Sequence, residues 1–290
     1  MLKRLKALVA AAAIVIGTVA SSATASALPL APDPIPPVTG IPQPCPAQHE
    51  WDAHASLSTI KADIAKNYGI KLVGDGWTKQ VNKPIVKIVW ETLDAVSCTP
   101  YLSTIKTKTR GNIGLNATSI SGYAWGDWSL TRANYVSFDF AKMSQALDAG
   151  DPGRIVRVIV HELGHAYNVD RYENPAYWVE FNKLVAKHGK FTDYAGSSIT
   201  ETYAEVVGYY VARCAAKNPY DTGKFDEYYA FAKRTVFAGR EFAGAAGSKV
   251  DCSMKVTKRA RPNGVVTVPW ATSRLVAPTG AAPTAAPVKG

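Results

Sequence analysis

Two histidines four residues apart, His161 and His165, are the side chains of this chain best suited to metal chemistry. On an α-helix, residues four apart lie on one face about one turn from each other, so both imidazoles could reach one metal ion. Glu162 follows the first histidine, where a carboxylate could take a proton from a metal-activated water. The pattern predicts a metal centre on a helix. The alternative is a buried helix with incidental histidines, which would need other polar partners.

The surrounding residues favour a helix. An apolar run covers residues 155–160, just before the first histidine. Asp151 and Pro152 offer an N-cap residue followed by a first-turn proline. The predicted helix therefore begins about ten residues before the histidine pair.

A zinc site needs a third protein ligand and an open position for water. The extended motif with a glycine and a third histidine after His165 is absent, because those positions are Asn168 and Arg171. Downstream, Glu201 and Glu205 are again four apart and predict two carboxylates on one helical face. One could bind the metal while the other orients a ligand histidine. The alternative for this pair is a solvated charged face.

The segment from Tyr194 to Glu205 resembles the C-terminal catalytic segment of zinc metalloproteases of the anthrax lethal factor type, which the Pro-Pro endopeptidases share. Proteins of that type carry an HExxH helix, then a tyrosine seven residues before a glutamate, then an aromatic-Ala-Glu run. Here the tyrosine and the glutamate are Tyr194 and Glu201, and the run is Tyr203-Ala204-Glu205. The resemblance covers residues 161–205.

The resemblance implies a role for each matching residue. His161, His165 and Glu201 would bind one Zn²⁺ ion, with Glu201 as a gluzincin-type third ligand. Glu162 would be the general base and Tyr194 would stabilise the transition state. Glu205 would support the site without touching the metal.

The chain ends predict export and low-complexity segments. Residues 1–27 read as a signal peptide, with Lys3, Arg4 and Lys6 before a short apolar core and Ala25-Ser26-Ala27 as the cleavage site. Residues 28–47 form a proline-rich spacer and residues 273–290 an Ala/Pro-rich tail expected to be disordered. Residues 48–272 remain for the catalytic domain. We expect a secreted, extracellular protein with no transmembrane segment in its mature form.

Four cysteines lie beyond the predicted signal peptide, and an even number in an exported protein predicts two disulfides. Sequence alone allows three pairings. We expect Cys45–Cys98 and Cys214–Cys252. The alternative is that Cys45, in the proline-rich leader, silences the metal centre by occupying its open position as a thiolate.

The formal net charge is +10, and removal of the three basic residues of the signal peptide leaves +7. This charge suits an anionic envelope surface or an acidic substrate. Residues 255–261 are the nearest approach to a basic cluster but lack interleaved aromatic residues, so we expect no nucleic-acid partner. The expected partner is a peptide or protein substrate, and the expected oligomeric state is a monomer.

Hydropathy patterns predict an α+β fold of the zincin-like type, with a β-rich part before the metal helix and a helical part after it. The expected elements are a helix at 51–68, a strand or helix at 83–96, β-rich structure at 106–140 with a strand at 133–140, and a short helix at 143–149. Further helices are expected at 176–187, 200–216 and 225–242, with a loop at 189–198 that holds Tyr194.

Two tryptophans just before the predicted strand, Trp125 and Trp128, have two interpretations. They could line a substrate pocket and stack on proline rings, as the Pro-Pro endopeptidase resemblance allows. They could instead pack a hairpin into the core.

Taken together, these patterns predict a secreted zinc-dependent metalloendopeptidase that hydrolyses peptide bonds through a metal-activated water. The alternative is a catalytically silent protein of zincin fold that binds an envelope or extracellular partner. A peptide-cleavage assay on a Glu162 variant discriminates the two, because only an enzyme needs that carboxylate.

Overall fold

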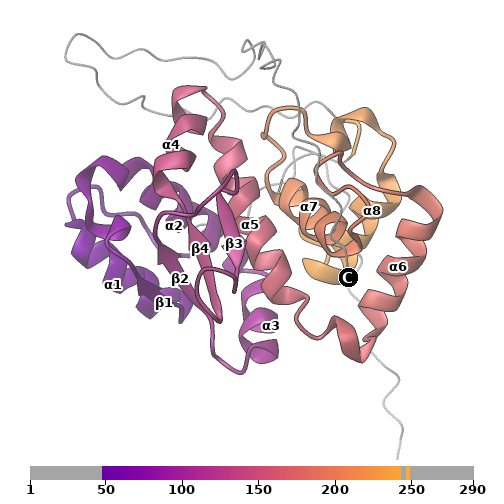
Figure 1. Ribbon diagram of the computed structural model, residues 1–290, viewed down its shortest axis with the longest axis horizontal. Coiled ribbons are helices and arrows are strands. Elements are labelled where there is room, and N and C mark those ends of the chain that lie inside the picture. Colours follow the sequence, from indigo (N-terminus) through magenta and orange to yellow (C-terminus); the bar gives the residue numbers. More distant parts are fainter. Residues whose placement is uncertain (1–47, 243–245, 249–290) are drawn as a thin grey trace, which may run out of the picture. The chain divides into compact units, whose positions relative to one another are not determined.

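The computed structural model describes residues 48–242 and 246–248 (Figure 1). These residues form a mixed α and β structure, as the sequence predicts at this coarse level. The predicted signal peptide, proline-rich spacer and C-terminal tail, with Cys45 and Cys252, lie outside the described residues. No helix in the described ranges is long and apolar enough to cross a membrane.

The sheet has four short strands in the order β1-β2-β4-β3. They are β1 (Lys71–Val73), β2 (Gly114–Ala117), β3 (Gly126–Trp128) and β4 (Tyr135–Phe138). β1, β2 and β4 run parallel, whereas β3 pairs antiparallel with β4 and forms one edge. The register pairs Gly126 with Phe138 and Trp128 with Val136.

Helices surround these strands in the part of the chain before the metal helix. They are α1 (Leu57–Tyr68), α2 (Lys83–Ser97), α3 (Tyr101–Lys108) and α4 (Phe140–Asp148), with 3₁₀ turns at Gly76–Thr78 and Gln80–Asn82. The expected β-rich part is therefore more helical than predicted. Residues 83–97 are helix throughout, and α3 occupies the start of the range expected to be β-rich.

The helix α5 (Pro152–Tyr167) lies between the sheet and the later helices (Figure 1). Asp151 caps its first turn by accepting a hydrogen bond from the backbone N–H of Arg154 at 3.1 Å. α5 packs against β3 and β4 on one side and α7 on the other. A Cβ atom added at Gly164 would lie 3.3 Å from Ala204 Cα, and one at Gly208 would lie 3.1 Å from the Arg157 carbonyl. Glycine at both positions allows the two helices to approach closely.

The chain after α5 is helical, with α6 (Ala176–His188), α7 (Ile199–Val211) and α8 (Asp226–Phe231), a π-helical turn at Ala232–Val236, and 3₁₀ turns at Arg171–Glu173 and Pro219–Thr222. Two predicted helices end early. The helix expected to reach residue 216 stops at Val211, where the Asn218 amide donates to the carbonyls of Tyr209 and Ala212. The helix expected over 225–242 ends at Val236.

Aromatic side chains fill the core on the side of α5 that faces α7. Tyr203 is fully buried, and rings from α5 and α6 surround it, including Tyr167 and Phe181. Such ring contacts add specific packing geometry to hydrophobic burial. This core fixes the position of α7 along α5, and α7 carries both predicted site glutamates.

Cys98 and Cys214 are both disulfide-bonded, and no described cysteine is free. The cysteines expected to pair with them lie outside the described residues, so the pairing stays a prediction.

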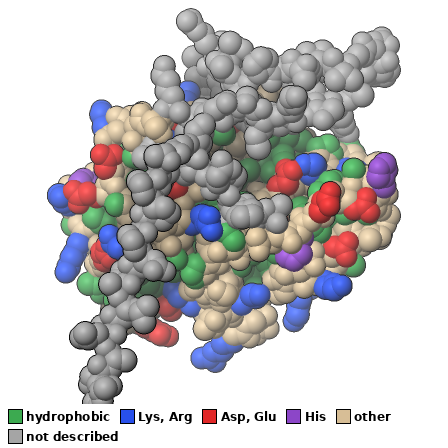
Figure 2. Space-filling view, turned by 180° about the vertical axis from the view of Figure 1, so that it is seen from behind, with side chains coloured by type: hydrophobic (Ala, Val, Ile, Leu, Met, Phe, Trp, Pro, Cys, Tyr) green, Lys and Arg blue, Asp and Glu red, His purple; other side chains and the backbone are tan. Residues whose placement is uncertain are grey.

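Figure 2 shows the molecule from behind the view of Figure 1, and basic and acidic side chains are interspersed on the part of this face that undescribed residues do not cover. The positive net charge therefore does not gather into one continuous patch there.

Candidate metal centre

The side chains of His161, His165 and Glu201 converge between α5 and α7. The two Nε2 atoms are 3.2 Å apart. Glu201 Oε2 lies 3.2 Å from His161 Nε2, and Glu201 Oε1 lies 3.3 Å from His165 Nε2. These three residues form a group that could bind a metal ion.

The spacing of these atoms fits a tetrahedral ion. Bond lengths of about 2.0–2.1 Å and tetrahedral angles place neighbouring ligand atoms about 3.3 Å apart. In addition, Glu201 Oε2 is buried and accepts no hydrogen bond of acceptable geometry from a described residue, although His161 lies close to it. Two imidazoles and a carboxylate are ligands that zinc prefers, and a buried carboxylate oxygen with no other partner is suited to bind a cation.

Glu205 contacts His161 at Nδ1, the ring nitrogen that does not face the metal group. Its Oε1 atom lies 2.9 Å from His161 Nδ1, so a proton on Nδ1 leaves Nε2 free to face the metal site. Arg157 donates to the same Oε1 atom, and the Thr192 hydroxyl donates to Oε2 at 2.9 Å. The carboxylate is almost fully buried and held by three partners. Glu205 therefore lies in the supporting position, and Glu201 faces both Nε2 atoms.

The electrostatics of the group favour a cation. Burial disfavours a charged imidazole, but the adjacent carboxylates of Glu201 and Glu205 outweigh it and raise the pKa of His161 to about 9. Burial would raise the pKa of Glu201, yet the adjacent imidazoles of His161 and His165 lower it well below its usual value. A negative field that holds a proton on His161 would equally stabilise a metal ion in its place.

Glu162 lies on the side of α5 that faces the sheet. A Cβ atom added at Gly126, the first residue of β3, would lie 2.7 Å from Glu162 Cγ. Glycine at this position lets the edge strand lie against the carboxylate, because a Cβ atom there would force the strand or Glu162 to shift. Burial raises the pKa of Glu162, while His161 and His165 act in the opposite direction. A buried carboxylate with a raised pKa is suited to proton transfer.

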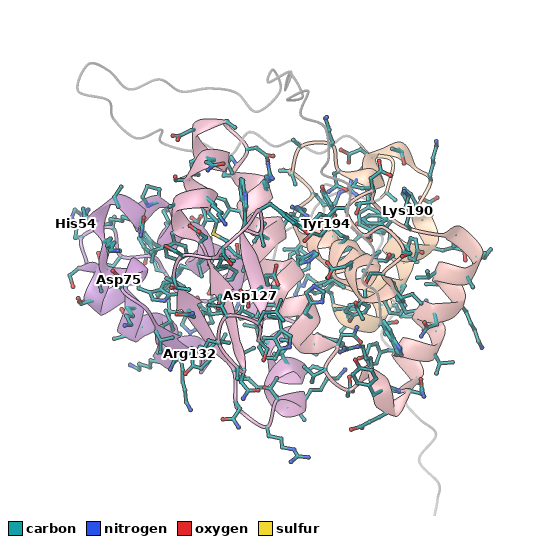
Figure 3. All side chains as sticks on the ribbon, viewed as in Figure 1. His54, Asp75, Asp127, Arg132, Lys190 and Tyr194 are labelled. Atoms are coloured by element: carbon teal, nitrogen blue, oxygen red, sulfur yellow. The ribbon has the colours of Figure 1, made fainter. Side chains whose placement is uncertain are left out.

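Tyr194 lies on the loop between α6 and α7, at the surface beside the metal group (Figure 3). Its side chain is 55% exposed, and its ring centroid is 5.8 Å from that of His161. Burial, with the charges of Glu201 and Glu162, raises the pKa of Tyr194 to about 12. The phenol therefore stays protonated near neutral pH and can donate a hydrogen bond to a bound group.

Trp125 and Trp128 are half-buried and pack against the hydrophobic core. Trp125 also lies under Arg154 of α5, whose guanidinium carbon is 3.9 Å from the ring centroid. The preceding loop is fixed by Lys142 Nζ, which donates to the carbonyls of Gly122 and Ala124 at 2.8 and 2.9 Å. The two tryptophans thus help to build the wall next to the site, and a substrate contact for them stays a prediction.

Sequence patterns did not predict three residues that contact this site: Arg157, Thr192 and Gly126. Arg157 precedes His161 by four residues, so its place on the ligand face of α5 could have been read from spacing. Thr192 and Gly126 carry no local signal, because each reaches the site only through tertiary packing.

Comparisons with family models, with curated proteins and with solved structures found no match to this chain. The candidate site therefore rests on its own geometry.

Proposed function

We propose that this protein is a secreted zinc metalloendopeptidase of zincin-like fold, similar to the lethal factor and Pro-Pro endopeptidase type. One observation carries the proposal. α5 directs two imidazole nitrogens toward Glu201 on one side and presents a buried carboxylate, Glu162, on the side facing β3. Metal ligands and a proton-accepting group thus come from adjacent residues of one rigid helix, as metal-assisted hydrolysis requires.

His161, His165 and Glu201 would hold the ion, and Glu205 would keep His161 in the tautomer that leaves Nε2 available. A zinc ion held there would supply Lewis acidity and an activated water at neutral pH. Glu162 would accept the proton released during attack on a peptide carbonyl and return it to the leaving amine. The Tyr194 phenol would donate a hydrogen bond to the oxygen that becomes negatively charged.

Peptide digestion tests the proposal. Residues 28–290, loaded with zinc, are incubated with a diverse peptide library beside a Glu162→Ala variant, and the products are identified by mass spectrometry. We expect cuts made only by the unmodified protein. Equal cutting by both proteins would reject the mechanism. No cutting by either, with one zinc bound to each, would reject the peptidase and favour a binding protein.

A further inference from the structure

A pocket of about 710 Å³ lies next to the metal group, because two of its lining residues, Tyr194 and Glu205, contact His161. Tyr194, Glu205 and Arg157 contribute to its wall from the metal-centre side. Its remaining walls combine aromatic rings with basic side chains. They include Phe191, Tyr209, Phe225, Arg154, Lys190 and Lys217.

The pocket is lined by more basic than acidic side chains. Four basic residues line it, against Asp151, Asp193 and Glu205. Glu205 is bound to Arg157, and Asp193 pairs with Lys190 at 2.9 Å. Within the described ranges, neither Arg154 nor Lys217 lies within ion-pair distance of a carboxylate.

Arg154 is held in place without its charge being neutralised. Its guanidinium stacks on Trp125 at 3.9 Å, which fixes the group while leaving its N–H donors available. Burial, and to a lesser extent the charge of Arg157, lower the pKa of Arg154, while Asp151 and Tyr209 act in the opposite direction. A planar guanidinium with free donors is suited to a carboxylate.

The pocket lies along the same helix face as the metal ligands. Arg154 precedes His161 by seven residues, which is two helical turns and about 10 Å along the axis of α5. An extended peptide advances about 3.3 Å per residue. A peptide whose scissile bond lies at the metal group would therefore reach the pocket roughly three residues away.

We propose that this pocket, with Arg154 and Lys217 as its free cations, binds a carboxylate of the peptide substrate about three residues from the scissile bond. The inference rests on the proposed peptidase function and adds a substrate preference to it. The carboxylate could belong to an acidic side chain or to the C-terminus of a short peptide. The aromatic walls would pack against the apolar part of the same residue.

A positional scan tests the inference. A peptide cleaved by the protein is remade with Asp, or with isosteric Asn, at each position within four residues of the cut, and with a free or amidated C-terminus. We expect the ratio of kcat/KM for Asp over Asn to reach about tenfold at one position near the third residue, as a charge-assisted hydrogen bond would give. A preference for the free over the amidated C-terminus would identify the terminal carboxylate instead.

Charge-reversal variants assign the preference to the pocket. Arg154→Glu and Lys217→Glu should each lower the Asp/Asn ratio to one or below, and Arg154→Gln and Lys217→Gln should lower it part of the way. Lys183→Glu makes the same charge change on an exposed part of α6 outside the pocket and should keep the ratio. Thermal melting checks that every variant is folded.

Three results would overturn the inference. One is cleavage with no acidic preference at any position or terminus, which leaves the peptidase proposal intact. The second is an acidic preference that survives both charge reversals. The third is failure to cleave any peptide, which removes the proposed function and this inference with it.

Discussion

The two sides of α5 contribute different things to the candidate site. The side facing α7 meets charged and polar groups: Glu201 at both imidazole Nε2 atoms, and Glu205 with Arg157 and Thr192 behind them. The side facing β3 meets Gly126. Because this residue has no side chain, the strand can lie against the buried Glu162. One side presents groups that could bind a cation, and the other holds a buried carboxylate against the edge strand.

One helix can therefore hold metal ligands and a proton acceptor in different environments. The adjacent imidazoles of His161 and His165 lower the pKa of Glu201 and keep it available as a ligand, whereas burial raises the pKa of Glu162 and suits it to accept a proton. We therefore expect substitutions on the α7 side to weaken metal binding. Those on the β3 side should reduce turnover while the metal stays bound.

Glu162→Gln is expected to show the largest difference between its effect on turnover and its effect on metal binding. This substitution keeps the shape of the side chain but removes the proton acceptor, so kcat should fall by about 10²- to 10⁴-fold. Zinc content, measured by plasma emission spectrometry, should remain that of the unmodified protein. Loss of zinc together with activity would place Glu162 among the metal ligands and contradict its role as a separate proton acceptor.

Tyr194→Phe tests the exposed phenol next to His161. Loss of one hydrogen-bond donor to the developing oxyanion should lower kcat by about 10²- to 10³-fold, with KM and zinc affinity nearly unchanged. Tyr172→Phe, at another strongly exposed tyrosine, serves as the matched control and should retain full activity. If kcat is the same in both variants, Tyr194 does not take part in the reaction.

Glu205→Gln tests the supporting layer on the α7 side. The weakened hydrogen bond to His161 and the uncompensated Arg157 charge should lower zinc affinity by about 10- to 100-fold, as competition with a chelator would measure. Glu173→Gln, at an exposed acidic residue away from the site, should leave the affinity unchanged. An affinity lost completely in Glu205→Gln and retained in Glu201→Gln would reverse the roles of the two glutamates.

Gly126→Ala is the smallest change and acts only on the β3 side. The new methyl group would lie 2.7 Å from Glu162 Cγ and must displace either the strand or the carboxylate. We expect kcat to fall by about tenfold, because a displaced group loses its alignment, while zinc content stays the same. Ser121→Ala, on the loop before β3, provides the control. Unchanged kcat in Gly126→Ala would show that the position of Glu162 does not depend on the strand.

Local helical geometry made the central group predictable. His161 and His165 share a face because they are four residues apart, and the same spacing placed Glu201 and Glu205 together. The order of the two glutamates was assigned through the position of Tyr194, and the structure brings all three to the same site. The four-residue spacing carries this information because it depends only on local helix geometry. The seven-residue spacing from Tyr194 to Glu201 ordered the glutamates only through the resemblance to the lethal factor type.

Other features could not be predicted because they depend on packing between distant segments. β1 has only three residues, too few for an alternating pattern, and forms by pairing with β2 some forty residues later. The early end of α7 depends on the Asn218 amide, a contact with no periodic signal. The Gly126 contact with Glu162 requires the edge strand to lie against α5.

Zinc K-edge X-ray absorption on the metal-loaded protein would identify the atoms bound to the metal. The geometry predicts one zinc with two imidazole nitrogens and a carboxylate oxygen at about 2.0–2.1 Å, and no sulfur. Glu162→Gln should give the same spectrum, whereas Glu201→Ala should lose a protein ligand or the metal. A sulfur shell near about 2.3 Å, or a shell with no imidazole scattering, would contradict the assignment of His161, His165 and Glu201 as the metal ligands.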